Sequence, residues 1–298
     1  MATGAVGAVD AIVCGVASPP GAGRLRRPPK VVAVTGSDAF AQVANLPGVA
    51  EAVTDARSAV DRLLGHRVLR RRSAEVSTEA ALRGARASAA LEGVSVTLDE
   101  IRAAEAPKDP VVQGALRVSA ELGSLVDTWR QAPRQVLARL HVLAAADAVE
   151  ESALGRPRAE GQEVEDVLGL GQPPSVREVA SRLDMLCSLL TQPTDAPALV
   201  VAAIVHGELL TLRPFGWGDG IVARAAQRLT MVARGLDPKS LTAPEVGHAE
   251  LAEEYAAALR GYVSGTPKGV AGWIRHCGDA TAAAARDSQA ICEAILRG

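Results

Sequence analysis

The segment from Arg213 to Arg224 carries the residues of this 298-residue chain that are best suited to chemistry on an anion. It reads Arg-Pro-Phe-Gly-Trp-Gly-Asp-Gly-Ile-Val-Ala-Arg. Gly218 and Gly220 permit a tight turn with exposed backbone N–H groups, just before a predicted helix over 221–234. The start of such a helix attracts anions, and Arg224 can hold a phosphate or carboxylate through two hydrogen bonds. The segment therefore predicts an anion-binding loop.

This loop resembles the signature of the Fic (Fido) family of nucleotidyl transferases, which reads His-Pro-Phe-x-Asp/Glu-Gly-Asn-Gly-Arg-x-x-Arg. The present chain keeps Pro214, Phe215, Gly218, Gly220 and Arg224. It has Arg213 in place of the histidine, Trp217 for the acidic residue, Asp219 for the asparagine and Ile221 for the first arginine. The order of predicted helices and loops over 136–235 also follows the family. The resemblance covers about two-thirds of the chain.

The resemblance implies a reaction in which a target hydroxyl attacks the α-phosphate of a nucleotide. That reaction needs a base, a cation and fixed donors, and family members use the histidine as base and the Asp/Glu to hold Mg²⁺. Arg213 cannot act as a base at neutral pH, because the pKa of a guanidinium exceeds about 12. Trp217 offers no oxygen to Mg²⁺, and Ile221 lacks a charge to grip phosphate. The chain keeps the anion cradle and loses the catalytic groups.

Asp219 leaves two interpretations open. Its charge repels a polyphosphate, or its carboxylate binds a metal ion and partly replaces the missing acid. A base or ligand from the long Gly/Pro-containing gap over 151–174 is a further alternative. The carboxylates of that gap, which also fit a solvated loop, are Glu160, Glu163, Glu165 and Asp166. His206 lies about 10 Å before Arg213 along a continuous helix, so we expect it to be a core residue.

A second motif runs from Ser88 to Gly93 and reads Ser-Ala-Ala-Leu-Glu-Gly. It resembles the inhibitory motif of the same family, Ser/Thr-x-x-x-Glu-Gly/Asn. The resemblance implies that Glu92 pairs with Arg224 and fills the space of a nucleotide γ-phosphate. We therefore predict a Glu92–Arg224 salt bridge that closes the anion pocket. The alternatives are a simple helix end with a glycine stop, or a pair that only holds the N-terminal helix to the core.

The elements that must position these residues are helical throughout. From Val49 onward apolar residues recur at helical spacing, so we predict an all-α fold, a Fic-like helical bundle with an N-terminal helical extension. Thr97 to Glu100 has the form of a capping box. We expect a flexible leader over 1–46, an N-terminal helical region with the inhibitory-like motif over 47–107, and a Fic-like helical core over 108–298. Predicted helices cover about 49–64, 78–92, 111–130, 133–150, 175–191, 197–211, 220–235, 248–263 and 269–296.

Composition limits the compartment and the partners. The formal net charge of −2 argues against a nucleic-acid surface, which is usually clearly basic. The longest apolar run, over 196–205, is too short to span a bilayer, so we expect a soluble, cytoplasmic protein. The spacing of the cysteines and histidines indicates no metal site. The cysteines, expected to be reduced and mostly buried, are Cys14, Cys187, Cys277 and Cys292.

Two functional hypotheses follow. The first is a catalytically degenerate Fic-like protein that acts as a binding or regulatory module, with a protein partner and with an anion or nucleotide pocket retained. It requires no cofactor. The second is an active nucleotidyl or phosphoryl transferase with a non-standard site, which would use Mg²⁺ and a nucleotide. The sequence names neither the partner nor the oligomeric state.

Overall fold

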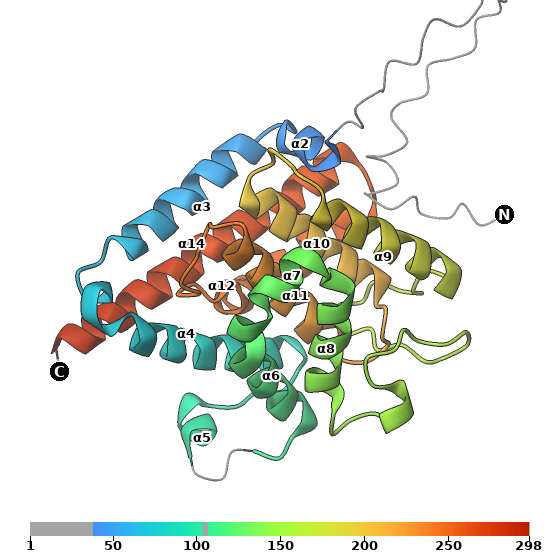
Figure 1. Cartoon of the computed structure of the whole chain (residues 1–298), viewed down its shortest axis with the longest axis horizontal. Helices are drawn as coiled ribbons and strands as arrows, with labels where there is room; N and C mark the ends of the chain where they lie inside the picture. Colours follow the sequence, from blue (N-terminus) through green and yellow to red (C-terminus); the bar gives the residue numbers. More distant parts are fainter. Residues whose placement is uncertain (1–37, 104–106, 298) are drawn as a thin grey trace, which may run out of the picture.

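The computed structural model describes residues 38–103 and 107–297, and all regular structure within those ranges is helical (Figure 1). This confirms the all-α prediction. In chain order the elements are α2 (Ala39–Ala44), α3 (Val49–Leu64), α4 (Leu69–Leu91), α5 (Leu98–Arg102), α6 (Pro110–Glu121), the 3₁₀ turn η1 (Leu122–Leu125), α7 (Val126–Gln131), α8 (Pro133–Ala145), the 3₁₀ turn η2 (Glu151–Ala153), α9 (Val176–Thr191), α10 (Ala198–Leu212), α11 (Asp219–Ala233), α12 (Pro244–Glu250), α13 (Ala252–Val263) and α14 (Pro267–Arg297).

Helices α10 and α11 form the centre of the molecule and hold the loop 213–218 between them. From Leu199 to its end α10 is buried on all sides, as expected of a helix that is apolar all round. Its neighbours approach closely at Gly207, where a Cβ would overlap the rings of Trp273 and Tyr262. A core this poor in large side chains depends on such backbone contacts.

The N-terminal helices belong to the same packed body as the rest. Helix α3 lies along α14, and α4 crosses beside α6 and α12 (Figure 1). Val49 and Ala56 of α3 and Ala85 of α4 are buried in one hydrophobic cluster with α10 and α11. The inhibitory-like motif on α4 is therefore fixed to the core through a continuous apolar contact.

Two predicted boundaries differ from the structure at the N-terminal side. Residues 39–44, placed in the leader, form α2, where Asp38 caps the helix and Phe40 is buried; residues 1–37 lie outside the described residues. Helix α4 begins at Leu69 and not near Thr78, with a kink at Arg72. The hydroxyl of Thr78 bonds back to the Ala74 carbonyl within the helix, so it does not start one.

Other boundaries follow local sequence signals. The segment predicted as one helix over 111–130 is divided by η1 into α6 and α7, and the one over 248–263 is divided at Leu251 into α12 and α13. Pro244 begins α12 earlier than predicted, as proline often does at a first helical position. The capping box between Thr97 and Glu100 is confirmed, with both reciprocal hydrogen bonds.

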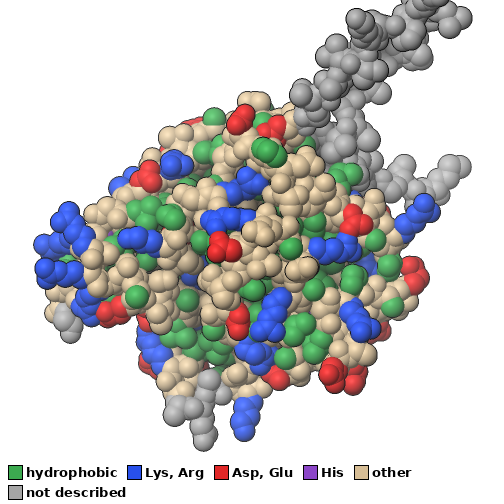
Figure 2. All heavy atoms as spheres, in the orientation of Figure 1, with side chains coloured by type: hydrophobic (Ala, Val, Ile, Leu, Met, Phe, Trp, Pro, Cys, Tyr) green, Lys and Arg blue, Asp and Glu red, His purple; other side chains and the backbone are tan. Residues whose placement is uncertain are grey.

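The surface is mixed in charge. Figure 2 shows acidic and basic side chains interspersed over one face, with basic ones gathered at the end where the C-terminus lies. Exposed Arg67, Arg70 and Arg71 stand near the start of α4 at that end. Among the described helices, none combines the length and apolar character that crossing a bilayer requires.

Candidate functional site

The anion loop contains three residues with left-handed φ, of which Gly216 (φ 85°) is the middle one. Helix α10 ends at Arg213 (φ 44°), and Gly218 (φ 65°) precedes the first turn of α11. Between them Phe215 is buried, and its ring stacks on His141 with centroids 4.2 Å apart. The predicted turn is thus present, although Gly220 lies inside α11 and not in the turn itself.

Arg213 holds the loop in place. Its guanidinium is buried, with Nη1 3.2 Å from Asp166 Oδ1, and Nη2 donates to the Gly171 carbonyl at 2.7 Å. Burial lowers its pKa, while the charge of Asp166 raises it. The side chain at the family's base position therefore ties the 151–174 segment to the loop.

The 151–174 segment also contacts the loop through its backbone. The Arg158 N–H donates to the Pro214 carbonyl at 2.8 Å, and the Glu165 N–H donates to the Gly216 carbonyl at 3.1 Å. The Arg158 guanidinium donates further to the carbonyls of Arg213 and Pro174. This buried arginine was not predicted, because only the fold shows that it covers the loop.

Asp219 faces the loop's own backbone. Its two carboxylate oxygens accept from Phe215 N–H at 3.0 Å and Gly216 N–H at 2.8 Å. Burial raises the pKa of this carboxyl to about 7 against the opposing effect of those hydrogen bonds, and the charge of Glu92 raises it further. Asp219 is thus buried and already engaged by two donors, although it lines the cavity at the loop.

The predicted ion pair between Glu92 and Arg224 is confirmed. Glu92 Oε1 lies 2.5 Å from Arg224 Nη2, and both side chains are almost fully buried. Ser88 adds to the contact, because its hydroxyl accepts from Arg224 Nε at 3.0 Å and its carbonyl accepts from Nη2 at 3.1 Å. Gly93 (φ 88°) ends α4 directly after the glutamate, so the motif is also a glycine-stopped helix end. Ser88 and Glu92 of the motif therefore act together on Arg224.

Glu92 also covers the start of α11. A Cβ at Gly220 would overlap the Glu92 carboxylate, so only glycine lets the acid approach the helix N-terminus this closely. The cavity that remains beside it has a volume of about 30 Å³. A site of about 10–15 Å³ by this measure takes one water, so the cavity has room for water and none for a nucleotide. The chain's own carboxylate fills the anion position.

The carboxylates of the 151–174 segment separate into two groups. Glu165 and Asp166 line the cavity together with Glu92, Arg213 and Asp219. Burial and the charge of Glu92 raise the pKa of Glu165. Glu160 and Glu163 are exposed and lie outside that lining. No histidine is among the described residues that line the cavity, and His206 is a fully buried core residue, as expected.

The proteins to which this chain is similar are solved structures with a similar fold. No protein-family model and no curated protein matches the sequence. A Fic family protein from Desulfovibrio desulfuricans G20 matches with a TM-score of 0.64 at 20% identity, over 80% of this chain and 74% of that one. A fragment of Fic-1 from C. elegans matches at 0.62 and 17%, over 88% and 83%. A Fic domain containing signaling protein from Bacteroides thetaiotaomicron VPI-5482 matches at 0.59 and 12%, over 82% and 98%.

The chain has the Fic fold. At these identities the likeness concerns the fold alone, and the chemistry must be argued from the residues at the site. Two of the replaced signature positions, Trp217 and Ile221, lie in different surroundings. Trp217 is half-buried within the loop, whereas Ile221 is buried in the hydrophobic core. An arginine at position 221 would have to reach out of apolar packing.

Proposed function

We propose that this protein is a catalytically degenerate Fic-fold protein that acts as a binding or regulatory module. The observation that carries the proposal is the environment of Arg213. The residue at the family's base position is a guanidinium engaged by Asp166 and by the Gly171 carbonyl, and it has no lone pair with which to accept a proton. A hydroxyl brought to this loop meets no base there.

The contacts of the two acids support the same proposal. Glu92 lies on Arg224 and on the start of α11, where a phosphate would bind, and Asp219 uses the N–H groups of Phe215 and Gly216. Arg224 and the N–H groups of Phe215 and Gly216 therefore already donate to carboxylates of the chain itself. An external anion must therefore displace Glu92 before it can bind.

The alternative, an active nucleotidyl or phosphoryl transferase, is favoured by one observation. Glu165 lines the cavity, and its raised pKa brings it toward the range useful for a general base. Under this alternative Mg²⁺ and a nucleotide would enter after Glu92 withdraws. Asp219 fits a metal ligand poorly, because both its oxygens accept backbone N–H groups.

The test uses the full chain and Glu92→Gly, which removes the covering carboxylate. Each protein is incubated with radiolabelled ATP, UTP or GTP and with Mg²⁺ or Mn²⁺. We expect no covalent label on either protein. Labelling of Glu92→Gly that is lost in Glu92→Gly/Glu165→Gln would establish the transferase and end the proposal.

Thermal shift with the same nucleotides measures binding independently of transfer. We expect Glu92→Gly to be stabilised by nucleotide more than the parent chain, by about 2.7 kcal/mol at a hundredfold excess over Kd. The matched control is Glu92→Gly/Arg224→Gln, which lacks the remaining phosphate-binding side chain. Stabilisation without label would support a binding module that retains the anion pocket. Absence of both would leave a protein partner as the ligand, to be sought by co-purification.

A further inference from the structure

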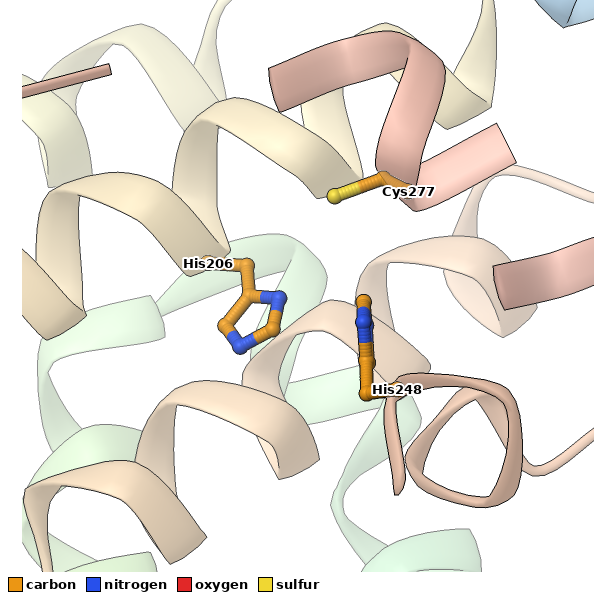
Figure 3. A group of neighbouring side chains, drawn as sticks. All are labelled: His206, His248 and Cys277. Carbon is orange, nitrogen blue, oxygen red and sulfur yellow. The ribbon is translucent and has the colours of Figure 1, made fainter. Parts of the chain in front are cut away.

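Two histidines and a cysteine from three helices meet in the core, away from the anion loop. His206 comes from α10, His248 from α12 and Cys277 from α14, and each is fully buried (Figure 3). One potential ligand atom from each lies within 4.8 Å of the other two. Their spacing in the sequence predicts no such ligand set, because the residues are far apart along the chain and only helix packing brings them together.

One atom of this cluster has no hydrogen-bond partner. His206 Nε2 lies 3.0 Å from the Tyr255 hydroxyl, whereas His206 Nδ1 is buried and unpartnered among the described residues. Burying a polar atom without a hydrogen-bond partner destabilises the folded state. Figure 3 shows a ring nitrogen of His206 on the side that faces His248. The orphaned nitrogen and the nearby thiol are the donors that a soft metal ion would satisfy.

The surrounding hydrogen bonds resemble a supporting shell. Metal-binding histidines usually donate their other ring N–H to a fixed acceptor, which orients the ring. Tyr255 is so placed for His206. His248 contacts Gln227 Oε1 at 2.9 Å and His276 Nε2 at 3.0 Å, one through each ring nitrogen. An ion would replace one of these contacts, and the other would hold the ring.

Binding must displace a proton from the Cys277 sulfur to solvent, because the thiolate and not the thiol ligates a metal ion.

We propose that His206 Nδ1, one ring nitrogen of His248 and Cys277 Sγ hold a single thiophilic d¹⁰ metal ion, Cu⁺ or Zn²⁺. Bonds of about 2.0 Å to nitrogen and about 2.3 Å to sulfur place three such ligands about 3.5–3.7 Å apart, so the cluster must close by about 1 Å. Two histidines and one cysteine form the trigonal set of many copper sites. With the thiolate, Cu⁺ gives a neutral complex and Zn²⁺ a cationic one, so Cu⁺ is the favoured ion in this fully buried cluster.

The test is metal binding by the full chain with the other cysteines removed, as Cys14→Ser, Cys187→Ser and Cys292→Ala. The chelator-treated protein is refolded with or without Cu⁺ or Zn²⁺ and freed of excess ion, and its metal content is measured. We expect one ion per chain, slow loss to chelator in the folded state and rapid loss on unfolding. Affinity is then measured by competition with a chromophoric chelator of each ion, and Cu⁺ should bind more tightly.

Variants assign the ligands. Cys277→Ser should lower the affinity by more than about 100-fold, since it removes a ligand where outer contacts alone are worth about 10–100-fold. Tyr255→Phe, which removes the hydroxyl that contacts His206 and also Arg224, should lower it by about 10–100-fold. If Cys277→Ser does not fold, alkylation of Cys277 during denaturant titration serves instead, and bound ion should protect the thiol. Sub-stoichiometric binding of both ions, or unchanged affinity in Cys277→Ser, would overturn the proposal.

Discussion

Arg213 has a structural role in the loop, which follows from its backbone conformation and its contacts. Its φ of 44° is unusual for a residue with a side chain, and such a conformation costs about 1–3 kcal/mol unless neighbours impose it. Here Asp166 and the Gly171 carbonyl hold the guanidinium, while Arg158 donates to the Arg213 carbonyl. The Arg213 side chain fastens the 151–174 segment over the loop.

The buried ion pair gives the first residue-scale prediction. Glu92→Gln leaves the Arg224 charge buried without its partner, so it should lower the free energy of unfolding by about 3–5 kcal/mol. Urea denaturation followed by circular dichroism measures the change. The matched control is Glu75→Gln, which breaks the exposed pair with Arg72 and should cost less than about 1 kcal/mol. Equal effects in the two variants would show that burial adds nothing to the Glu92 pair.

Asp219 predicts a pH dependence of stability. Its carboxyl has a pKa of about 7 in the folded chain, above an ordinary value of 3.8, so the folded state keeps a proton that the unfolded state has released. The stabilising contribution is complete below about pH 4 and is lost as the pH rises to about 7, a change of about 4 kcal/mol. Asp219→Asn cannot titrate, so it should gain stability relative to the parent chain by that amount over this range.

Unfolding curves at several pH values between 4 and 8 measure this difference. Other titrating groups, Glu165 among them, act in both proteins and cancel. Any fixed cost from placing an amide N–H₂ near the loop's N–H groups shifts the whole curve equally. Parallel curves for the parent and Asp219→Asn would mean that the aspartate is ionised throughout.

At the scale of elements, some helices can approach each other closely only because glycine has no side chain. A Cβ at Gly247 in α12 would overlap the Ala280 carbonyl of α14, and backbone cannot move aside as a side chain can. Gly247→Ala should therefore lower stability by at least about 1–3 kcal/mol. Gly123→Ala in η1, where no atom lies within reach of a new Cβ, should be neutral or stabilise by up to about 1 kcal/mol. Chemical denaturation of both variants checks the contrast, and a tolerated Gly247→Ala would contradict this close approach.

The sequence predicts elements where local signals are strong. The periodic run from Val49 and the capping box at Thr97 correspond to α3 and the start of α5. The helix predicted from about 78, with Ser77 as its start signal, begins at Leu69 instead, and the Ser77 hydroxyl donates to the Ser240 carbonyl. The Glu92–Arg224 contact follows from the paired motifs. The hydrogen bonds of the Asp219 side chain to the N–H groups of Phe215 and Gly216 could not be predicted. The sequence does not determine whether this side chain points to the loop backbone or to solvent.

Clusters of residues that are far apart in the sequence could not be predicted from local patterns. His206, His248 and Cys277 show no ligand spacing, and only the packing of α10, α12 and α14 brings them together. Arg158 likewise gains its role from the segment that folds over the loop. Local patterns specify helices, caps and turns, whereas the relative placement of helices depends on side-chain volumes summed across the whole core.

At the scale of the whole molecule, the N-terminal helices and the remaining helices should unfold together. Leu63 of α3 is fully buried against residues of α4 and α14, far in sequence from the core tryptophans Trp129 and Trp273. Leu63→Ala should lower stability by about 2–5 kcal/mol through lost burial and a cavity. If the molecule is one cooperative unit, tryptophan fluorescence and far-UV circular dichroism must report the same shift. A shift in circular dichroism without a change in fluorescence would mean that α3 and α4 unfold separately. Glu92, at the end of α4, could then leave Arg224 while the remaining helices stay folded.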